Sequence, residues 1–307
     1  MEDETAGDPM SEKKWVRSSL RQLSEDLDKL GFYVGHMTVV RLLKKLGFSL
    51  KGNRKTSTGP PHPDRERQFR YIRRVKKLFE AAGHPIISVD TKKKELIGNF
   101  KNSGRVWCRE AEDVNVHDFP SDAIGRAVPY GIYDPIHNLG YVAVGTSADT
   151  SEFAVDAIWW WWELEDRPHF PDESKLLIES DAGGSDGCRF RLWKKRLQEQ
   201  LADRLGIEVL VCHYPTGASK WNPIEHRLFS YISLNWAGKP LRSFETMLNY
   251  IRDTTTKAGL KIKACLLDRE YEKQIKVSDR EMRALNLHRR RVCPKWNYVI
   301  KPRFASS

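Results

Sequence analysis

Apolar residues recur every three or four positions near the start of the chain, which is the period of an amphipathic helix. One such segment spans residues 18–30 and is closed by Gly31, and a second spans residues 36–46 after the short turn FYVG. Their apolar positions are Leu20, Leu23, Leu27, Leu30, Val39, Leu42, Leu43 and Leu46. Two short helices joined by a tight turn predict a helix-turn-helix, and a plain helical hairpin is the alternative.

The second of these predicted helices has a polar and basic side. In a helix-turn-helix the second helix enters the major groove of DNA. We therefore expect Thr38, Arg41, Lys44 and Lys45 to contact bases or phosphates. In a plain hairpin the same residues would form a solvated basic surface.

A stretch rich in Lys, Arg, Pro, Gly and Ser/Thr covers residues 51–67, which is typical of a linker. It separates a polar leader (1–17) and the helix-turn-helix segment (18–50) from the rest of the chain. Arg54 and Lys55 are predicted to contact DNA phosphates, because flexible basic arms neutralise the nucleic-acid backbone.

From residue 86 onward the pattern changes to strands that alternate with helices, after a basic helix over residues 64–82. The expected strands are 86–90, 95–100, 130–133 or 141–145, 175–181 and 207–212, and the expected helices are 151–164, 190–205 and the segment around Glu225. This is the order of a ribonuclease H-like fold, an α/β architecture with a mixed sheet flanked by helices. We assign it to residues 68–260, followed by a C-terminal extension at 261–307.

Three carboxylates stand where a metal-dependent phosphoryl-transfer enzyme needs them. Asp90 ends the run IISVD, Asp181 ends LLIESD, and Glu225 lies in the helical pattern WNPIEHRLFSYI. Their spacings, 181 − 90 = 91 and 225 − 181 = 44 residues, mean that only a fold can bring them together. Mg²⁺ prefers carboxylate oxygens, and paired divalent ions stabilise both oxygens of an in-line displacement. Taken singly, each acid has an alternative role as a turn former, helix cap or solvated residue.

The whole-chain composition favours an anionic partner. The net charge is +11 and the pI is near 9.4, which for a chain without an 18-residue apolar run points to nucleic acid rather than a membrane. Five cysteines form no CxxC pair, so neither a disulfide framework nor a zinc site is indicated. We expect a cytoplasmic, nucleoid-associated protein that binds DNA and has no small-molecule substrate.

Two local features have alternative interpretations. Lys92, Lys93 and Lys94 follow Asp90 and are predicted to contact DNA phosphates, with a charged hairpin tip as the alternative. The run Trp159–Trp162 lies in a predicted helix that turns Trp160 inward with Phe153, Ala157 and Leu164 and leaves Trp159 and Trp162 pointing elsewhere. The outward pair would cover another element, form a protein interface or reduce solubility.

A dense series of segments extends over nearly the whole chain: HMTVVRLLKKLGFSL, HPDRERQFRYI, ISVDTKKKELIGNFKN, NVHDFP, PYGIYD, GTSADTSEFAV, SDAGGSDG and SKWNPIEHRLFSYISLNW. In these segments the chain resembles bacterial insertion-sequence transposases of the ISAzo type, in the DDE superfamily. The resemblance implies a ribonuclease H-like catalytic domain behind a helix-turn-helix region. It places the DDE triad on Asp90, Asp181 and Glu225.

The resemblance also implies a reaction. Asp90 would bridge two Mg²⁺ ions, for which Mn²⁺ is expected to substitute, while Asp181 and Glu225 would each help to hold one. Cleavage at the transposon's terminal inverted repeats would free a 3′ hydroxyl that attacks target DNA, with a homo-oligomer holding both ends. Asn222 and His226 flank Glu225 and are candidates for orienting it or the substrate, with a helix cap and a surface histidine as the alternatives.

The chain departs from the family pattern in three places. Asp186 stands where a neutral polar residue is expected, and Trp159 and Trp160 stand where polar residues are expected. In addition, only the later part of the family's N-terminal helical region precedes the linker. The alternative hypothesis is therefore a truncated, catalytically silent DNA-binding protein that occupies the transposon ends. A ribonuclease H-like nuclease acting on structured nucleic acid is a third.

Overall fold

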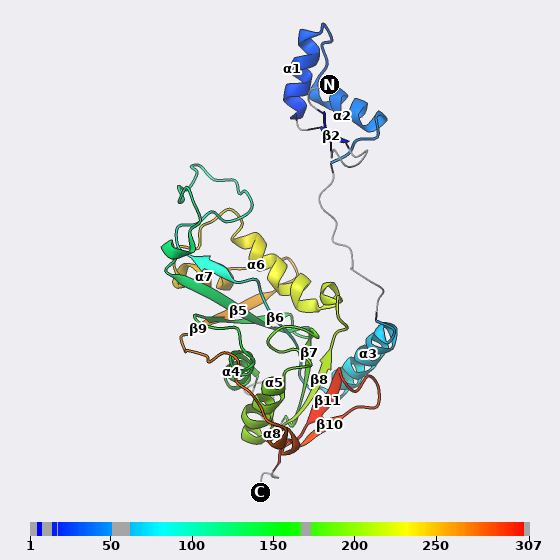
Figure 1. Ribbon diagram of the computed structural model, residues 1–307, viewed down its shortest axis with the longest axis vertical. Helices are drawn as coiled ribbons and strands as arrows, with labels where there is room; N and C mark the ends of the chain where they lie inside the picture. The colour runs from blue at the N-terminus through cyan, green and yellow to red at the C-terminus, as the bar shows by residue number, and fades with distance from the viewer. Residues whose placement is uncertain (1–4, 8–13, 17, 51–61, 167–172, 304–307) are drawn as a thin grey trace. The chain divides into compact units, whose positions relative to one another are not determined.

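The computed structural model describes residues 5–7, 14–16, 18–50, 62–166 and 173–303. The chain divides into two compact units, Met1–Thr58 and Gly59–Ser307, and each is described by itself (Figure 1). Arg54 and Lys55, predicted to contact DNA, lie outside the described residues.

The N-terminal unit contains the two predicted helices. They are α1 (Leu20–Lys29) and α2 (His36–Lys45), and the Ser19 hydroxyl caps the first by accepting a hydrogen bond from the Gln22 backbone at 3.2 Å. The expected polar leader contributes two short strands, β1 (Thr5–Gly7) and β2 (Lys14–Val16), which pair antiparallel.

The apolar faces of these two helices are less buried than their periodicity predicts. Leu23 and Val39 are buried, whereas Leu30, Leu42 and Leu46 are exposed. Each helix has ten residues, so the pair shields only the positions near its contact. The expectation that Leu42 and Leu46 are buried is therefore wrong for this unit.

The second unit is built on a mixed sheet. Its central strands are β3 (Ile86–Thr91), β5 (Gly125–Asp134), β6 (Leu139–Gly145), β7 (Lys175–Ser180) and β8 (Glu208–His213), in the spatial order β6-β5-β3-β7-β8. Strand β5 pairs antiparallel with both β3 and β6, whereas β7 and β8 run parallel to β3. This is the ribonuclease H-like arrangement predicted from the sequence.

Two details of the sheet differ from the prediction. The alternatives 130–133 and 141–145 are both strands, being parts of the β5–β6 hairpin. The predicted strand 95–100 is only β4 (Glu95–Ile97), which pairs with one end of β5, away from the main strand order.

The C-terminal residues complete the sheet at both edges. Strand β9 (Lys261–Leu267) runs parallel to β6, and β11 (Asn297–Ile300) runs antiparallel to β8, with β10 (Leu287–Arg289) outside it. Residues 261–307, which we expected to follow the catalytic domain as an extension, thus belong to the same compact unit.

Helices cover both faces of the sheet because the strands alternate apolar side chains between them. On one face, α4 (Ser151–Trp161) and α5 (Arg191–Arg196) pack on a core that includes Ile87 and Ile178. Each continues into a π-helical segment, η2 (Trp162–Asp166) and η3 (Leu197–Asp203).

On the opposite face, α3 (Arg65–Ala82) covers β3, β7 and β8, and α6 (Ser230–Asn235) and α7 (Phe244–Arg252) cover β5 and β6 (Figure 1). The remaining elements are η1 (Pro120–Asp122), η4 (Ser219–Trp221), η5 (Glu225–Phe229) and α8 (Asp279–Arg283). No helix within the described residues is both long and apolar enough to cross a membrane.

The tryptophan run is arranged differently from the prediction. Trp161 and Trp162 lie in the core, whereas Trp160 is 39% exposed. Trp159 is half-buried, and the Arg204 guanidinium lies 4.2 Å from the centre of the Trp159 ring. The helix packs on more than one side, and the π-helical segment that begins at Trp162 changes the angular spacing of the side chains. The expected inward and outward assignments of Trp160 and Trp162 are both wrong.

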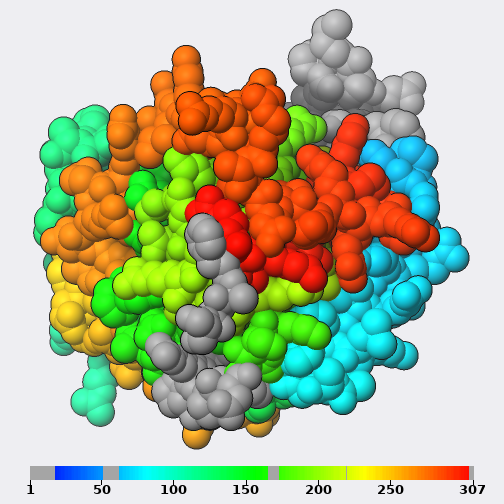
Figure 2. Space-filling view, turned by 90° about the horizontal axis from the view of Figure 1, so that it is seen from below, coloured from blue at the N-terminus to red at the C-terminus, as the bar shows by residue number. Residues whose placement is uncertain are grey.

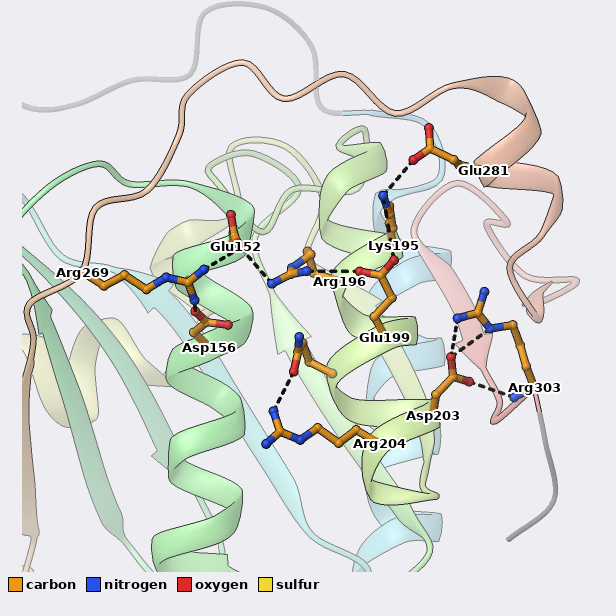
Figure 3. Close-up of polar contacts among 11 residues, drawn as sticks. Glu152, Asp156, Lys195, Arg196, Glu199, Asp203, Arg204, Arg269, Glu281 and Arg303 are labelled. Carbon is orange, nitrogen blue, oxygen red and sulfur yellow. Dashed lines mark hydrogen bonds and ion pairs between the residues drawn. The ribbon is translucent and has the colours of Figure 1, made fainter.

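An ionic network ties the chain after β9 to the helices of the α4–α5 face (Figure 3). The Arg269 guanidinium lies 2.6 Å from Asp156 and 3.2 Å from Glu152, and Arg196 contacts the same Glu152 at 2.8 Å. Lys195 on α5 reaches Glu281 on α8 at 2.7 Å. These contacts anchor the C-terminal segment to the sheet's helical layer.

Candidate active site

The two aspartates lie at the same edge of the sheet. In the parallel β3–β7 pair, Ser88 is opposite Glu179, so Asp90 and Asp181 each follow two residues later along neighbouring strands. Adjacent strands are about 4.8 Å apart, and residues two apart share a face. The sheet register therefore brings the carboxyl ends that carry Asp90 and Asp181 side by side.

Glu225 begins the helical segment η5, which is packed on the neighbouring strand β5. Ile224 and Phe229 are buried over Gly131, the residue that pairs with Asp90 across the β3–β5 ladder. A Cβ atom at position 131 would lie 2.5 Å from Phe229 and 2.9 Å from Ile224. The glycine thus permits the helix that carries Glu225 to approach the strands that carry the aspartates.

Asn222 connects these elements. Its side chain is fully buried, and its amide nitrogen donates to Asp181 Oδ1 at 3.3 Å and to the Val89 carbonyl at 3.5 Å. The Ser88 hydroxyl donates to the Asn222 amide oxygen and accepts from the Ile224 backbone at 3.4 Å. Asn222 therefore joins both aspartate-bearing strand ends to the start of the glutamate helix, and its side chain does not act as a helix cap.

His226 is directed away from the acids. Its Nε2 bonds the Lys220 backbone carbonyl at 2.5 Å, and the residue lies at an exposed position. The geometry gives His226 a local role in the turn before the helix.

The lysines after Asp90 are arranged differently from one another. Lys92 is only 9% exposed, lies 3.2 Å from Glu95 and 4.6 Å from the Trp236 ring, and has a pKa lowered by burial. Lys94 lies 3.6 Å from Asp149, and Lys93 is exposed. Lys92 is therefore packed and paired with Glu95, and the contacts of the three lysines with DNA phosphates stay a prediction.

A fourth carboxylate joins the predicted three. Asp186 is buried in the turn after β7, and the Tyr130 hydroxyl donates to it at 3.3 Å. Burial, followed by the negative charges of Asp186, Asp181 and Glu225, raises the pKa of Asp90 to about 9. Burial and the charge of Asp181 likewise raise the pKa of Asp186 to about 8. The acids thus repel one another in a partly desolvated site.

Asp181 is held differently from Asp90. Burial and Glu225 raise the pKa of Asp181 to about 6, and the Asn222 hydrogen bond opposes the shift. The Thr91 backbone donates to Asp90 at 2.8 Å. Each aspartate therefore has a donor that favours its charged form.

Across the described residues, no group of three or more His, Cys, Asp or Glu side chains is arranged to hold a metal ion. The donor set nevertheless fits Mg²⁺ or Mn²⁺, which favour carboxylate oxygens. Mutual repulsion among Asp90, Asp181 and Asp186 is also the electrostatic environment that a divalent cation relieves.

A series of buried, hydrogen-bonded side chains lies beneath Asp181, and the sequence analysis did not predict it. His213 Nδ1 lies 2.9 Å from both the Ser180 hydroxyl and the Asp181 carbonyl, and its Nε2 lies 3.0 Å from the Tyr298 hydroxyl. The Trp193 indole donates to the same hydroxyl at 2.9 Å. Burial lowers the pKa of His213 to about 4, so the imidazole is neutral. The sequence did show a histidine at the end of the strand beside Asp181, which is a signal of a buried polar group. It did not show the partner of that histidine, because Tyr298 lies far away in the sequence.

In the N-terminal unit, Arg41 donates to Thr38 at 3.1 Å on α2, and Lys44 and Lys45 are exposed in its last turn. These positions leave the predicted basic side of α2 at the surface of its unit. Their contact with DNA stays a prediction.

A ribonuclease H-like sheet with acids ordered strand, strand, helix is typical of the DDE class of nucleic-acid enzymes. The chain belongs to the family described as the Rhodopirellula transposase DDE domain, whose model matches residues 1–302. No protein of curated function matches it.

Several solved structures are similar in fold. The Mos1 transposase paired-end complex with left transposon end has 14% identity and a TM-score of 0.44, over 80% of this chain and 73% of that one. The Mos1 strand transfer complex has 14% identity and a TM-score of 0.45, over 80% and 72%. The mariner Mos1 paired end complex with Mg has 14% identity and a TM-score of 0.45, over 76% and 65%.

Proposed function

We propose that this protein cleaves DNA strands at the ends of its own transposon and joins the freed ends to target DNA. The observation that carries the proposal is the register of Asp90 and Asp181 on adjacent parallel strands, tied through Asn222 to the helix of Glu225. Membership of a DDE transposase family gives this arrangement its chemical context.

In the proposed mechanism, Asp90, Asp181 and Glu225 hold divalent ions, with Mg²⁺ expected and Mn²⁺ able to replace it. Two such ions, when bound, stabilise both the attacking and the leaving oxygen of a phosphoryl transfer. The protein's own contribution is to orient the carboxylates. Asn222 fixes Asp181 and the Thr91 backbone fixes Asp90, so the ligands are positioned before DNA arrives.

DNA recognition in this proposal belongs to the N-terminal unit. Thr38, Arg41, Lys44 and Lys45 on α2 would contact the terminal inverted repeats, as the second helix of a helix-turn-helix does. Because transposition requires two ends to be held together, the active form is at least a dimer on DNA.

The proposal is tested with the full chain, Mg²⁺ and duplex DNA carrying the element's terminal repeats. Asp90→Asn is expected to abolish nicking while DNA binding persists, and the matched control Asp118→Asn, at an exposed position, is expected to keep both. Undiminished nicking by Asp90→Asn removes that residue from catalysis. Salt-dependent binding by wild-type protein that never nicks supports the silent DNA-binding alternative, and preferential cutting of an RNA:DNA hybrid supports the third hypothesis.

A further inference from the structure

Helix α3 carries a strong positive charge that its own side chains do not neutralise. Its eighteen residues include seven Lys or Arg and two Glu, a formal charge of +5 (7 − 2). The buried face holds Gln68, Ile72 and Val75, so the helical period turns Arg70, Arg74 and Lys77 outward.

These outward cations lack ionic partners. Arg70, Arg73, Arg74 and Lys77 are exposed and form no ion pair with any described residue. Arg73, Arg74 and Lys77, with Leu78, line a shallow depression of about 350 Å³. The two acids of the helix lie at the ends of this surface, Glu66 four residues before Arg70 and Glu80 three residues after Lys77, and Glu66 pairs with Arg65 at 2.9 Å.

A second basic segment lies beside the other edge of α3. The turn after β10 contains Arg290 and Arg291, both exposed, and Arg290 Nε donates to the Tyr71 hydroxyl on α3 at 3.2 Å. Burial raises the pKa of Tyr71, and the charges of Arg290 and Arg74 oppose this rise, so both arginines act on the same hydroxyl. Figure 2 shows the β10–β11 region next to α3 on one face of the molecule.

The start of α3 adjoins the candidate active site. The Gln68 side chain donates to the His213 carbonyl at 2.8 Å, and the Arg65 guanidinium lies 4.4 Å from the ring of Trp221, the residue before Asn222. The basic surface therefore begins at the acid-bearing edge of the sheet and extends along the helix away from it.

We propose that Arg70, Arg74, Lys77, Arg290 and Arg291 form a second DNA-binding surface, which holds the phosphate backbone of the duplex outside the catalytic acids. The inference rests on the proposed DNA substrate and adds a place on the catalytic unit where that substrate is bound. It is separate from the predicted contacts of α2, which lie in the other unit.

The dimensions of the surface match a duplex. From Arg70 to Lys77 the helix rises about 10 Å at 1.5 Å per residue, which is about three base pairs at 3.4 Å each. Arginine and lysine side chains on one exposed helical stripe can each neutralise a phosphate without reading a base. The surface is therefore expected to bind DNA without sequence preference.

The test compares the salt dependence of binding for a random-sequence 30-base-pair duplex, in EDTA, with the full chain. Each phosphate contact contributes about 0.9 to the slope of log K against log salt. The triple variant Arg70→Gln/Arg74→Gln/Lys77→Gln is expected to lower that slope by about 2 to 3. Arg290→Gln/Arg291→Gln is expected to lower it by about 1 to 2.

The matched control is Lys257→Gln/Lys273→Gln/Arg283→Gln, which removes the same charge from exposed positions elsewhere in this unit. An unchanged slope in the triple variant, or an equal loss in the control, overturns the proposal. Thermal melts verify that each variant is folded. If the wild-type protein never nicks DNA but the triple variant shows the predicted loss in the salt dependence of binding, the proposed function is refuted and the DNA-binding surface is still supported.

Discussion

Replacing Asn222 by alanine removes the buried side chain that joins both aspartate strands to the glutamate helix. The Ser88 hydroxyl loses its acceptor, and Asp181 loses the hydrogen bond that opposes the rise in its pKa. Leaving a buried polar group without a partner costs about 1–3 kcal/mol, and the lost amide contacts add to it, so we expect a loss of about 2–4 kcal/mol in unfolding free energy. That is a large fraction of the 5–15 kcal/mol typical of a domain.

Urea unfolding followed by tryptophan fluorescence measures this loss. Nine of the ten tryptophans lie in the Gly59–Ser307 unit, with Trp15 the exception, so the signal reports the unit that contains Asn222. Ser88→Ala and the double variant complete a cycle, in which the double loss is expected to fall short of the sum of the single losses by about 1 kcal/mol or more. A loss below about 0.5 kcal/mol for Asn222→Ala, or strict additivity in the cycle, would refute the reasoning.

Three further changes test other parts of the unit. Gly131→Ala places a Cβ 2.5 Å from Phe229, so it is expected to cost about 1–3 kcal/mol in urea unfolding and to slow nicking; unchanged values for both contradict the packing argument. Burial lowers the pKa of Lys194 to about 8, so its charged form opposes folding below that pH by up to about 3 kcal/mol. The Lys194→Met variant is therefore expected to be more stable than the wild type at pH 7, and this difference in unfolding free energy is expected to shrink toward pH 10. A difference that does not change with pH contradicts the lowered pKa of Lys194. Arg269→Ala removes a half-exposed guanidinium from Asp156 and is expected to cost about 0.5–1 kcal/mol in low salt and less in 0.5 M NaCl; equal losses in both salts argue against an ionic contribution.

The central fold could be predicted because local patterns and the family segments agreed. The apolar runs ending at Asp90 and Asp181 predicted two strands, and the chain between them forms the β5–β6 hairpin and then helix α4, which returns it parallel to β3. The same local signals could not show that β9 and β11 close the sheet's edges, because strand pairing over long separations leaves no periodic trace.

The site was predicted as a set of acids but not as a network. Asp186 stood out as an additional carboxylate, whereas the role of Ser88 could not be read, since its partner Asn222 is 134 residues away. The surroundings of Lys92 could not be predicted, because sequence shows a lysine's charge and does not show that Glu95 and Trp236 enclose its side chain. Tertiary packing also decided which tryptophans of the run are buried.

The placement of β9 and β11 has a consequence for how the protein is made. The sheet begins with β3 at residue 86 but gains its last neighbour only when residues 297–300 have been synthesised. Strand β6 waits for β9 over 267 − 145 = 122 residues, and β8 waits for β11 over 300 − 213 = 87 residues. At about 5–20 residues per second, these edges lack their partners for about 6–24 s and about 4–17 s. Unpaired strand edges are prone to aggregation, so the nascent catalytic unit is vulnerable on the ribosome while the short N-terminal unit has already emerged.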